Sequence, residues 1–264
     1  MSDDIHEIYA ISYGGHQRPG AENYIGDPHN TSPDPLEYYI WAIVGKSGTF
    51  VVDTGFDEIA AKRRNRPIKR PIGEGLKAVG IAPDSVKNVI ITHLHYDHSG
   101  NADLFPNARY HLQDCEMEYA TGRCMCHAHQ RAPFEIDYIV DTVKKVYTGR
   151  VEFHDGEAEL APGISVHHIG GHSKGLQCVR VKTKRGHVVL ASDCAHLHKH
   201  IDEGKVFPIT YNVADTLEGY KKLARLASSR QHIVPGHDPK TLDLYSAAKP
   251  GLDRVVRLDA EPKG

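Results

Sequence analysis

The chain has 264 residues, of which 40% are apolar and 25% are charged, and its formal net charge at pH 7 is −2. These values are ordinary for a globular protein with a sizeable core. The near-neutral charge gives no electrostatic reason to expect nucleic acid or a membrane surface as a partner. No apolar run approaches the roughly 20 residues of a membrane span. The opening residues, MSDDIHEIYA, lack the basic and apolar regions of a signal peptide, so we expect a cytoplasmic protein.

The first half of the chain predicts strands alternating with helices. Residues 35–56 form two apolar runs around a Gly-Lys-Ser-Gly turn, which predicts a hairpin whose second strand, FVVD, is buried. A short amphipathic helix over 72–81 should end near Gly80. The apolar strand VKNVIIT, residues 86–92, then leads directly into a dense group of histidines. Residues 101–120 predict a short helix, a strand and another helix.

The second half predicts further strands with a helix on either side. Residues 135–149 have helical spacing of apolar side chains, and short strands are expected over 151–154, 164–169, 177–183 and 186–193. A helix over 213–228, capped by Asp215 or a neighbour, precedes a last strand that ends at Gly236-His237. No polar linker divides the chain, so we predict a single domain over 1–264, built from layered sheets and helices.

Cysteine and histidine are the informative residue types. The five cysteines are an odd number in a chain of this size, which does not favour a disulfide framework. The 19 histidines are unusually many, and histidine is both the commonest metal ligand and the usual general base near neutral pH. In GRCMCHAHQR, four soft ligands stand within six residues: Cys124, Cys126, His127 and His129. We favour a loop beside the pocket or at an interface over a zinc site, because structural zinc sites usually draw their ligands from two segments.

The stretch THLHYDHSGN packs four ligand-type side chains into six residues: His93, His95, Asp97 and His98. His93 and His95 are two apart and would share one face of an extended strand end. Asp97 and His98 would follow in a tight turn. This arrangement allows two neighbouring metal ions, one held by each pair. A catalytic zinc usually takes about three protein ligands and a water, so further ligands are expected later in the chain.

Three later motifs supply those ligands. His172 stands in GGHSKG, Asp193 in LASDC and His237 in VPGHD. Each follows an apolar strand and is flanked by small or turn residues, as expected for ligands carried on loops. Alternatively, these side chains could be polar turn residues that only form hydrogen bonds with the backbone. That explanation would be reasonable for a single histidine, but it does not account well for seven ligand-type residues in this order.

These motifs together resemble the metallo-β-lactamase superfamily. Its HxHxDH motif stands at residues 93–98, and VVDTGF, GGHSKG, ASD and PGHD occur in the family's order over roughly residues 38–240. The resemblance implies an α/β fold, namely a four-layer αββα sandwich with the metals at one edge of its two sheets. It also implies two Zn²⁺ per chain: the first bound by His93, His95 and His172, the second by Asp97, His98 and His237, with Asp193 bridging both.

Such a metal pair is suited to hydrolysis. Two zinc ions can lower the pKa of a shared water from 15.7 to about 7, which makes hydroxide at neutral pH. Asp97 could accept the proton of this hydroxide and pass it to the leaving oxygen. The chemistry fits an ester, lactone, thioester, amide or phosphodiester. Asp53 in VVDTG is expected to orient a ligand histidine through its other ring nitrogen.

Within the superfamily, residues 37–56 and 80–120 are similar to the N-acyl homoserine lactonase group. That group usually places a tyrosine three residues beyond the bridging aspartate, where it helps to bind the lactone carbonyl. Here the position is His196, which we expect to donate this hydrogen bond, with His198 and Tyr211 as alternatives. Tyr96 replaces an apolar aromatic residue and would still wall the pocket, and Lys174 replaces a proline.

These departures favour a lactone other than an acyl-homoserine lactone. An anionic lactone is one option, because the segment AKRRNRPIKRP carries six basic residues between 62 and 70. This segment is either a solvated loop or a lid whose charges attract an anionic substrate.

We therefore predict a dinuclear zinc hydrolase that opens a lactone ring by attack of metal-bound hydroxide. The alternatives are a thioesterase of the glyoxalase II type, which shares the metal set, and a catalytically silent metal-binding member. Zinc β-lactamases usually carry cysteine where Asp193 stands, and the complete second-metal set counts against mononuclear iron dioxygenases. The expected partner is a small lactone or ester, and a homodimer is left open.

Overall fold

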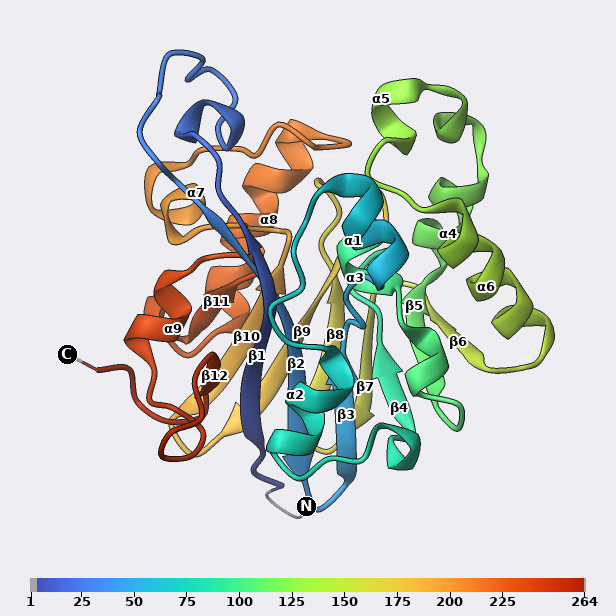
Figure 1. The fold of residues 1–264 in the computed structure, drawn as a ribbon, viewed down its shortest axis with the longest axis vertical. Helices are drawn as coiled ribbons and strands as arrows, with labels where there is room; N and C mark the ends of the chain where they lie inside the picture. Colours follow the sequence, from blue (N-terminus) through green and yellow to red (C-terminus); the bar gives the residue numbers. More distant parts are fainter. Residues whose placement is uncertain (1–3, 264) are drawn as a thin grey trace.

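The computed structural model describes residues 4–263 and shows two β-sheets packed face to face, with helices on both outer faces (Figure 1). The first sheet has the order β12-β1-β2-β3-β4-β5-β6. Its strands are β1 (Glu7–His16), β2 (Leu36–Gly45), β3 (Gly48–Val52), β4 (Asn88–Ile90), β5 (Arg109–Gln113), β6 (Val151–His154) and β12 (Val255–Arg257). The second sheet has the order β11-β10-β9-β8-β7. Its strands are β7 (Glu157–Ala161), β8 (Ile164–His168), β9 (Gln177–Thr183), β10 (Gly186–Ser192) and β11 (Ile233–Pro235).

The helices cover both outer faces. Those between β3 and β6 are α1 (Glu58–Arg64), α2 (Ile72–Ala78), α3 (Tyr96–Ser99), α4 (Asp114–Thr121), α5 (Ala128–Arg131) and α6 (Ile136–Tyr147). The later ones are α7 (His198–Glu203), α8 (Val213–Leu226) and α9 (Lys240–Leu244). Leu76 of α2 and Ile139 of α6 belong to the core on the outer face of the first sheet, whereas Leu223 of α8 packs on the second sheet. The predicted αββα architecture is therefore confirmed.

Strand β2 shows why the sequence favours this layering. Tyr38, Ile40 and Ala42 face the helical side, whereas Tyr39, Trp41 and Ile43 face the other sheet. Successive side chains of a strand point to opposite faces, so a strand that is apolar on both faces needs a packed layer on each side. The core between the sheets is built largely from such strands.

Most predicted elements are present, with some differences. The hairpin of β2 and β3 has Gly45 paired with Gly48 across its turn. Strands β1, β7 and β12 have no counterpart in the prediction, because β1 is interrupted by polar and glycine residues and β12 has only three residues. Helix α8 is capped by Asn212 rather than Asp215: the Asn212 side chain accepts hydrogen bonds from the backbone N–H groups of Ala214 and Asp215.

All five cysteines are free thiols. Within residues 4–263, no helix is both long and apolar enough to pass through a bilayer.

Candidate metal centre

The seven predicted ligands meet at one edge of the sandwich, on segments that follow strands. His172 follows β8, Asp193 follows β10 and His237 follows β11. Ser192 has a positive φ of 47°, which is uncommon outside glycine, and it turns the chain where β10 ends so that Asp193 enters the cluster. A sheet edge thus collects side chains that are far apart in the sequence.

The HxHxDH segment differs locally from its prediction. Strand β4 ends at Ile90, so His93 and His95 lie on an irregular segment and not on a strand end. Asp97 and His98 lie on α3, a single helical turn. Beyond the strand, the backbone N–H and the hydroxyl of Thr92 donate to the Asp53 carboxylate, at 2.7 and 2.9 Å, instead of to a neighbouring strand. The four side chains nevertheless point toward one place.

Several overlapping groups of donor atoms lie within 4.8 Å of one another, and two of them match the predicted ligand sets. The first group is His93, His95 and His172, and the second is Asp97, His98 and His237. In the first, His172 Nε2 lies 2.9 Å from His95 Nδ1. In the second, the two histidine Nε2 atoms each lie 3.7 Å from a carboxylate oxygen of Asp97.

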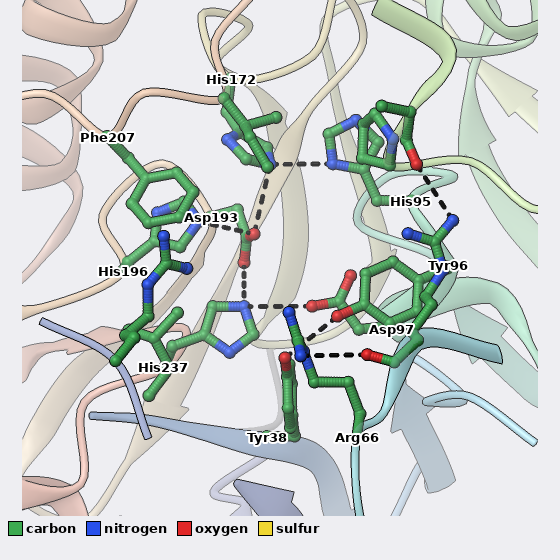
Figure 2. Close-up of a pocket in the computed structure, with 16 residues that line it drawn as sticks. Tyr38, Arg66, His95, Tyr96, Asp97, His172, Asp193, His196, Phe207 and His237 are labelled. Carbon is green, nitrogen blue, oxygen red and sulfur yellow. Dashed lines mark hydrogen bonds and ion pairs between the residues drawn. The ribbon is translucent and has the colours of Figure 1, made fainter. Parts of the chain in front are cut away.

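Asp193 stands between the two groups with one oxygen toward each (Figure 2). Its Oδ2 lies 3.2 Å from His172 Nε2 and 3.9 Å from His93 Nε2. Its Oδ1 lies 3.2 Å from His98 Nε2 and 2.9 Å from His237 Nε2. A carboxylate in this position has the geometry needed to bridge two cations.

The chemistry of the cluster fits metal ions. The Nε2 atoms of His93 and His98 are buried and make no hydrogen bond, although such atoms are normally satisfied. Burial and the neighbouring histidine His98 lower the pKa of His93 well below its usual value, so its ring nitrogen is neutral and free to bind a cation. Burial also acts on His98, but the Asp193 and Asp53 carboxylates outweigh it and raise the pKa of His98. Histidine nitrogen and carboxylate oxygen are donors that zinc accepts.

The ligands are oriented by a surrounding set of hydrogen bonds. His98 Nδ1 donates to Asp53 Oδ2 at 2.7 Å, the contact that the sequence led us to expect of Asp53. His237 Nδ1 donates to the backbone carbonyl of Glu37 at 2.9 Å. When one ring nitrogen holds a proton and donates it, the other is left free for a metal. These contacts therefore preset both histidines as Nε2 ligands.

Glu116 was not singled out by the sequence, although it links two ligand loops. Its buried carboxylate accepts from the Leu94 N–H at 2.9 Å, from the Ser173 hydroxyl at 2.8 Å and from the Gly175 N–H at 2.8 Å. Leu94 lies between two ligands of the HxHxDH segment, and Ser173 follows the ligand His172. No sequence motif marks Glu116, because its role depends on the packing of α4 against both loops.

The structure separates the predicted substrate contacts. His196 Nε2 lies 3.1 Å from Asp193 Oδ2, and its ring stacks on Phe207 with centroids 3.6 Å apart. Tyr96 lines the same pocket. His198 and Tyr211 do not line it. His198 Nδ1 donates to Asp238 Oδ2 at 2.6 Å, and Tyr211 is 39% exposed and packs on Tyr119. Helix α7 and the loop before α8 thus place His198 and Tyr211 outside the lining of this cavity.

The cluster opens into a cavity of ≈ 350 Å³. Residues that no sequence motif marked also line it: Arg18, Leu36, Tyr38, Phe207 and Ile209. They come from loops and a strand that only the fold brings together. The cysteine-histidine run at 124–129 contributes no group of converging donor atoms among the residues that the structure describes.

The basic segment is divided between the end of a helix and a loop. Its first part forms the end of α1, where Arg63 and Arg64 both pair with the buried Glu135. Arg70 pairs with Asp253 at 2.7 Å. Most of its basic residues thus form ion pairs with carboxylates of the protein. Arg64 and Arg66 also line the cavity.

Comparisons with known proteins agree with this geometry. Residues 33–262 match the family model of the metallo-beta-lactamase superfamily. The chain is 31% identical over 184 residues to the N-acyl homoserine lactonase AttM of Azorhizobium caulinodans, a match that covers 66% of each protein. It is 25% identical over 219 residues to an N-acyl homoserine lactonase of Bacillus cereus, covering 77% of this chain and 82% of that one.

Solved structures share the fold. A quorum-quenching N-acyl homoserine lactone lactonase superposes with a TM-score of 0.74 at 23% identity, covering 91% of this chain and 95% of the other. The dizinc quorum-quenching lactonase AidC gives a TM-score of 0.68 at 13% identity, with 90% of each chain covered.

The chain belongs to the metallo-beta-lactamase superfamily, as its motifs indicated. With relatives that are lactonases and a donor set suited to metal ions, this membership supports a metal-dependent hydrolase acting on ester bonds.

Proposed function

We propose that this protein is a dinuclear zinc lactonase. One observation carries the proposal: the two carboxylate oxygens of Asp193 face two separate groups of histidines, so the chain offers a complete set of ligands for two ions. The lactonase relatives support a lactone as the class of substrate. In this proposal the first ion is held by His93, His95 and His172, the second by Asp97, His98 and His237, and Asp193 touches both.

The zinc pair, when bound, would supply an activated water and polarise the ester carbonyl. Residues of the chain would transfer the proton, bind the substrate carbonyl and exclude water. Asp97 lines the cavity, so its carboxylate can take the proton of the attacking water and return it to the leaving oxygen. His196 also lines the cavity, and its Nε2 would donate to the substrate carbonyl. Leu36, Phe207 and Ile209 line the cavity with apolar surface that would exclude water.

The test is a turnover screen of zinc-loaded protein with γ- and δ-lactones, N-hexanoyl-homoserine lactone and S-lactoylglutathione, followed by proton release. We expect lactones to be opened faster than the thioester, with turnover abolished by chelation and by Asp97→Ala. Faster turnover of the thioester would identify a thioesterase instead. Binding of two zincs without turnover of any of these compounds would identify a catalytically silent member.

A further inference from the structure

The cavity contains an arginine that the fold does not neutralise. Arg66 lines the cavity, and among residues 4–263 no carboxylate lies within 4.0 Å of its guanidinium group. Its Nη1 donates to the carbonyls of Arg64 and Asn65, at 3.0 and 3.3 Å, whereas its buried Nε has no hydrogen-bond partner. A half-buried cation with an unsatisfied donor is costly unless something else pairs with it.

A second arginine faces the same space. Arg18 lines the cavity with its guanidinium 5.1 Å from the Phe207 ring, and its side chain is only 15% exposed. Its partner Glu22 is 54% exposed and lies 3.3 Å away, so that ion pair is partly screened by solvent. Burial lowers the pKa of Arg18, against the opposing effect of the Glu22 carboxylate, and the like charge of Arg66 acts in the same direction as burial. Both guanidinium groups thus line one cavity that could receive an anion.

The other basic residues near the cavity each have a carboxylate partner within the protein. Arg64 also lines the cavity, but it is paired with Glu135 at 2.7 Å and lies over the Tyr96 ring. Lys69 lies 3.8 Å from a carboxylate oxygen of Glu37. The unneutralised charge is therefore concentrated at Arg66, with Arg18 beside it.

Arg66 lies on the same cavity as the candidate metal centre, with Tyr38 close to both. Tyr38 separates the two: its hydroxyl lies 3.0 Å from that of Tyr96, and its ring packs 5.4 Å from His237. Figure 2 shows Arg66 and Tyr38 on the same side of the cluster as Asp97 and His237. Arg66 lines the same cavity as the predicted ligands Asp97 and His237, so a ligand whose carbonyl lay at the cluster would have room to direct a charged substituent toward Arg66.

We propose that Arg66, assisted by Arg18, is a binding site for an anionic group on the substrate, and that the natural substrate is a lactone or ester bearing a carboxylate. Guanidinium groups recognise carboxylates through paired, charge-assisted hydrogen bonds, and Arg66 lines the cavity without a carboxylate partner among residues 4–263. The proposal rests on the lactonase function for the identity of the reacting bond. The anion site itself depends only on the arginines.

The test separates these two parts by measuring binding and turnover with matched compounds. Binding uses 3-oxocyclopentane-1-carboxylate and its carboxamide, which have the shape of a γ-lactone but no ester bond, and calorimetry with the zinc-loaded protein. Turnover uses 5-oxotetrahydrofuran-2-carboxylate and its carboxamide. The variants are Arg66→Gln, Arg66→Lys and Arg18→Gln. Arg109→Gln is the control, because Arg109 is exposed, lies outside the cavity and pairs with Glu152.

We expect wild-type protein to bind the carboxylate at least about 10-fold more tightly than the carboxamide, with a preference that falls as salt rises. Arg66→Gln should remove most of this preference, Arg18→Gln a smaller part and Arg109→Gln none. Arg66→Lys should keep part of it, which guards against a misfolded glutamine variant. Equal binding of both compounds, or a preference unchanged in Arg66→Gln, would overturn the anion site. Carboxylate-selective binding by a protein that opens neither these lactones nor those of the turnover screen would leave the site standing and overturn the lactonase function.

Discussion

Asp53 accepts a hydrogen bond from Nδ1 of His98 at 2.7 Å. The same carboxylate accepts from the backbone N–H and the hydroxyl of Thr92, so one buried side chain fixes both the ring of His98 and the loop that carries it. Asp53 itself has a φ of 61°, a left-handed conformation that costs energy in residues other than glycine. The strained backbone conformation thus occurs at the residue that orients the predicted ligand His98.

Asp53→Asn should weaken zinc binding at the second metal position. The amide keeps the size of the carboxylate but loses the charge that stabilises the Nδ1 proton of His98. Loss of such a supporting partner typically costs about 10- to 100-fold in metal affinity or activity. Zinc competition with a chromophoric chelator would measure it, with the exposed Asp103→Asn as control. Wild-type affinity for both zincs in Asp53→Asn would show that this hydrogen bond does not support the ligand.

Glu116→Gln should loosen two ligand loops together. Glu116 holds the HxHxDH segment through Leu94 and the His172 loop through Ser173 and Gly175. The glutamine amide cannot accept as many hydrogen bonds, and replacing a buried charge-assisted acceptor costs about 1.5–3 kcal/mol in the free energy of unfolding. Urea titration would measure this loss of stability. A zinc titration should also show weaker binding of the ion that His172 would hold. An unchanged urea midpoint would contradict the role of Glu116 as a link between the loops.

His196→Phe tests whether His196 contacts the substrate or the metal. We expect the phenylalanine ring to stack on Phe207 as His196 does, and the variant to keep both zincs. The kcat should fall about 100-fold, because a hydrogen-bond donor to the substrate carbonyl is lost. Metal analysis beside steady-state kinetics distinguishes the roles. Loss of one zinc equivalent in the variant would instead make His196 a ligand, which its distance of 3.1 Å from Asp193 Oδ2 also permits.

Unfolding free energy should depend on pH through His111, a residue of β5 that is not one of the seven predicted ligands. Burial lowers the pKa of His111 to about 4, whereas an unfolded chain titrates near 6.5. Between these values the unfolded state binds more protons, so stability is complete above about pH 6.5 and is lost as the pH falls toward 4. The slope contributed by one such group is at most about 1.4 kcal/mol per pH unit.

His111→Gln would remove this dependence. The difference in unfolding free energy between wild type and variant, measured by urea titration at several pH values, cancels contributions from the metal centre. We expect the wild type to lose its relative stability as the pH falls from 6.5 to 4.5. A difference that stays constant with pH would mean that His111 titrates normally in the folded protein.

The sequence allowed the layering, and the residues that converge at the cluster, to be predicted because both depend on local patterns. Asp193 and His237 each follow an apolar strand, and a strand that is apolar on both faces, such as β2, requires two covering layers. The β1 strand was missed because Gly14 and Gly15 weaken its pattern, and its place in the sheet comes from pairing with β2.

The walls of the cavity could not be predicted, because they depend on long-range packing. Arg18 and Phe207 stand almost 190 positions apart, and neither belongs to a motif. The basic segment was visible in the sequence, but which of its charges are neutralised depends on partners such as Glu135, which only the fold brings near.

The most direct test of the central claim is the zinc content of protein that has been saturated with zinc and passed through gel filtration. If seven side chains hold two ions around Asp193, the wild type should retain two zincs per chain and Asp193→Ala no more than one. A wild-type protein that retains only one zinc, or an Asp193→Ala variant that still retains two, would contradict the account.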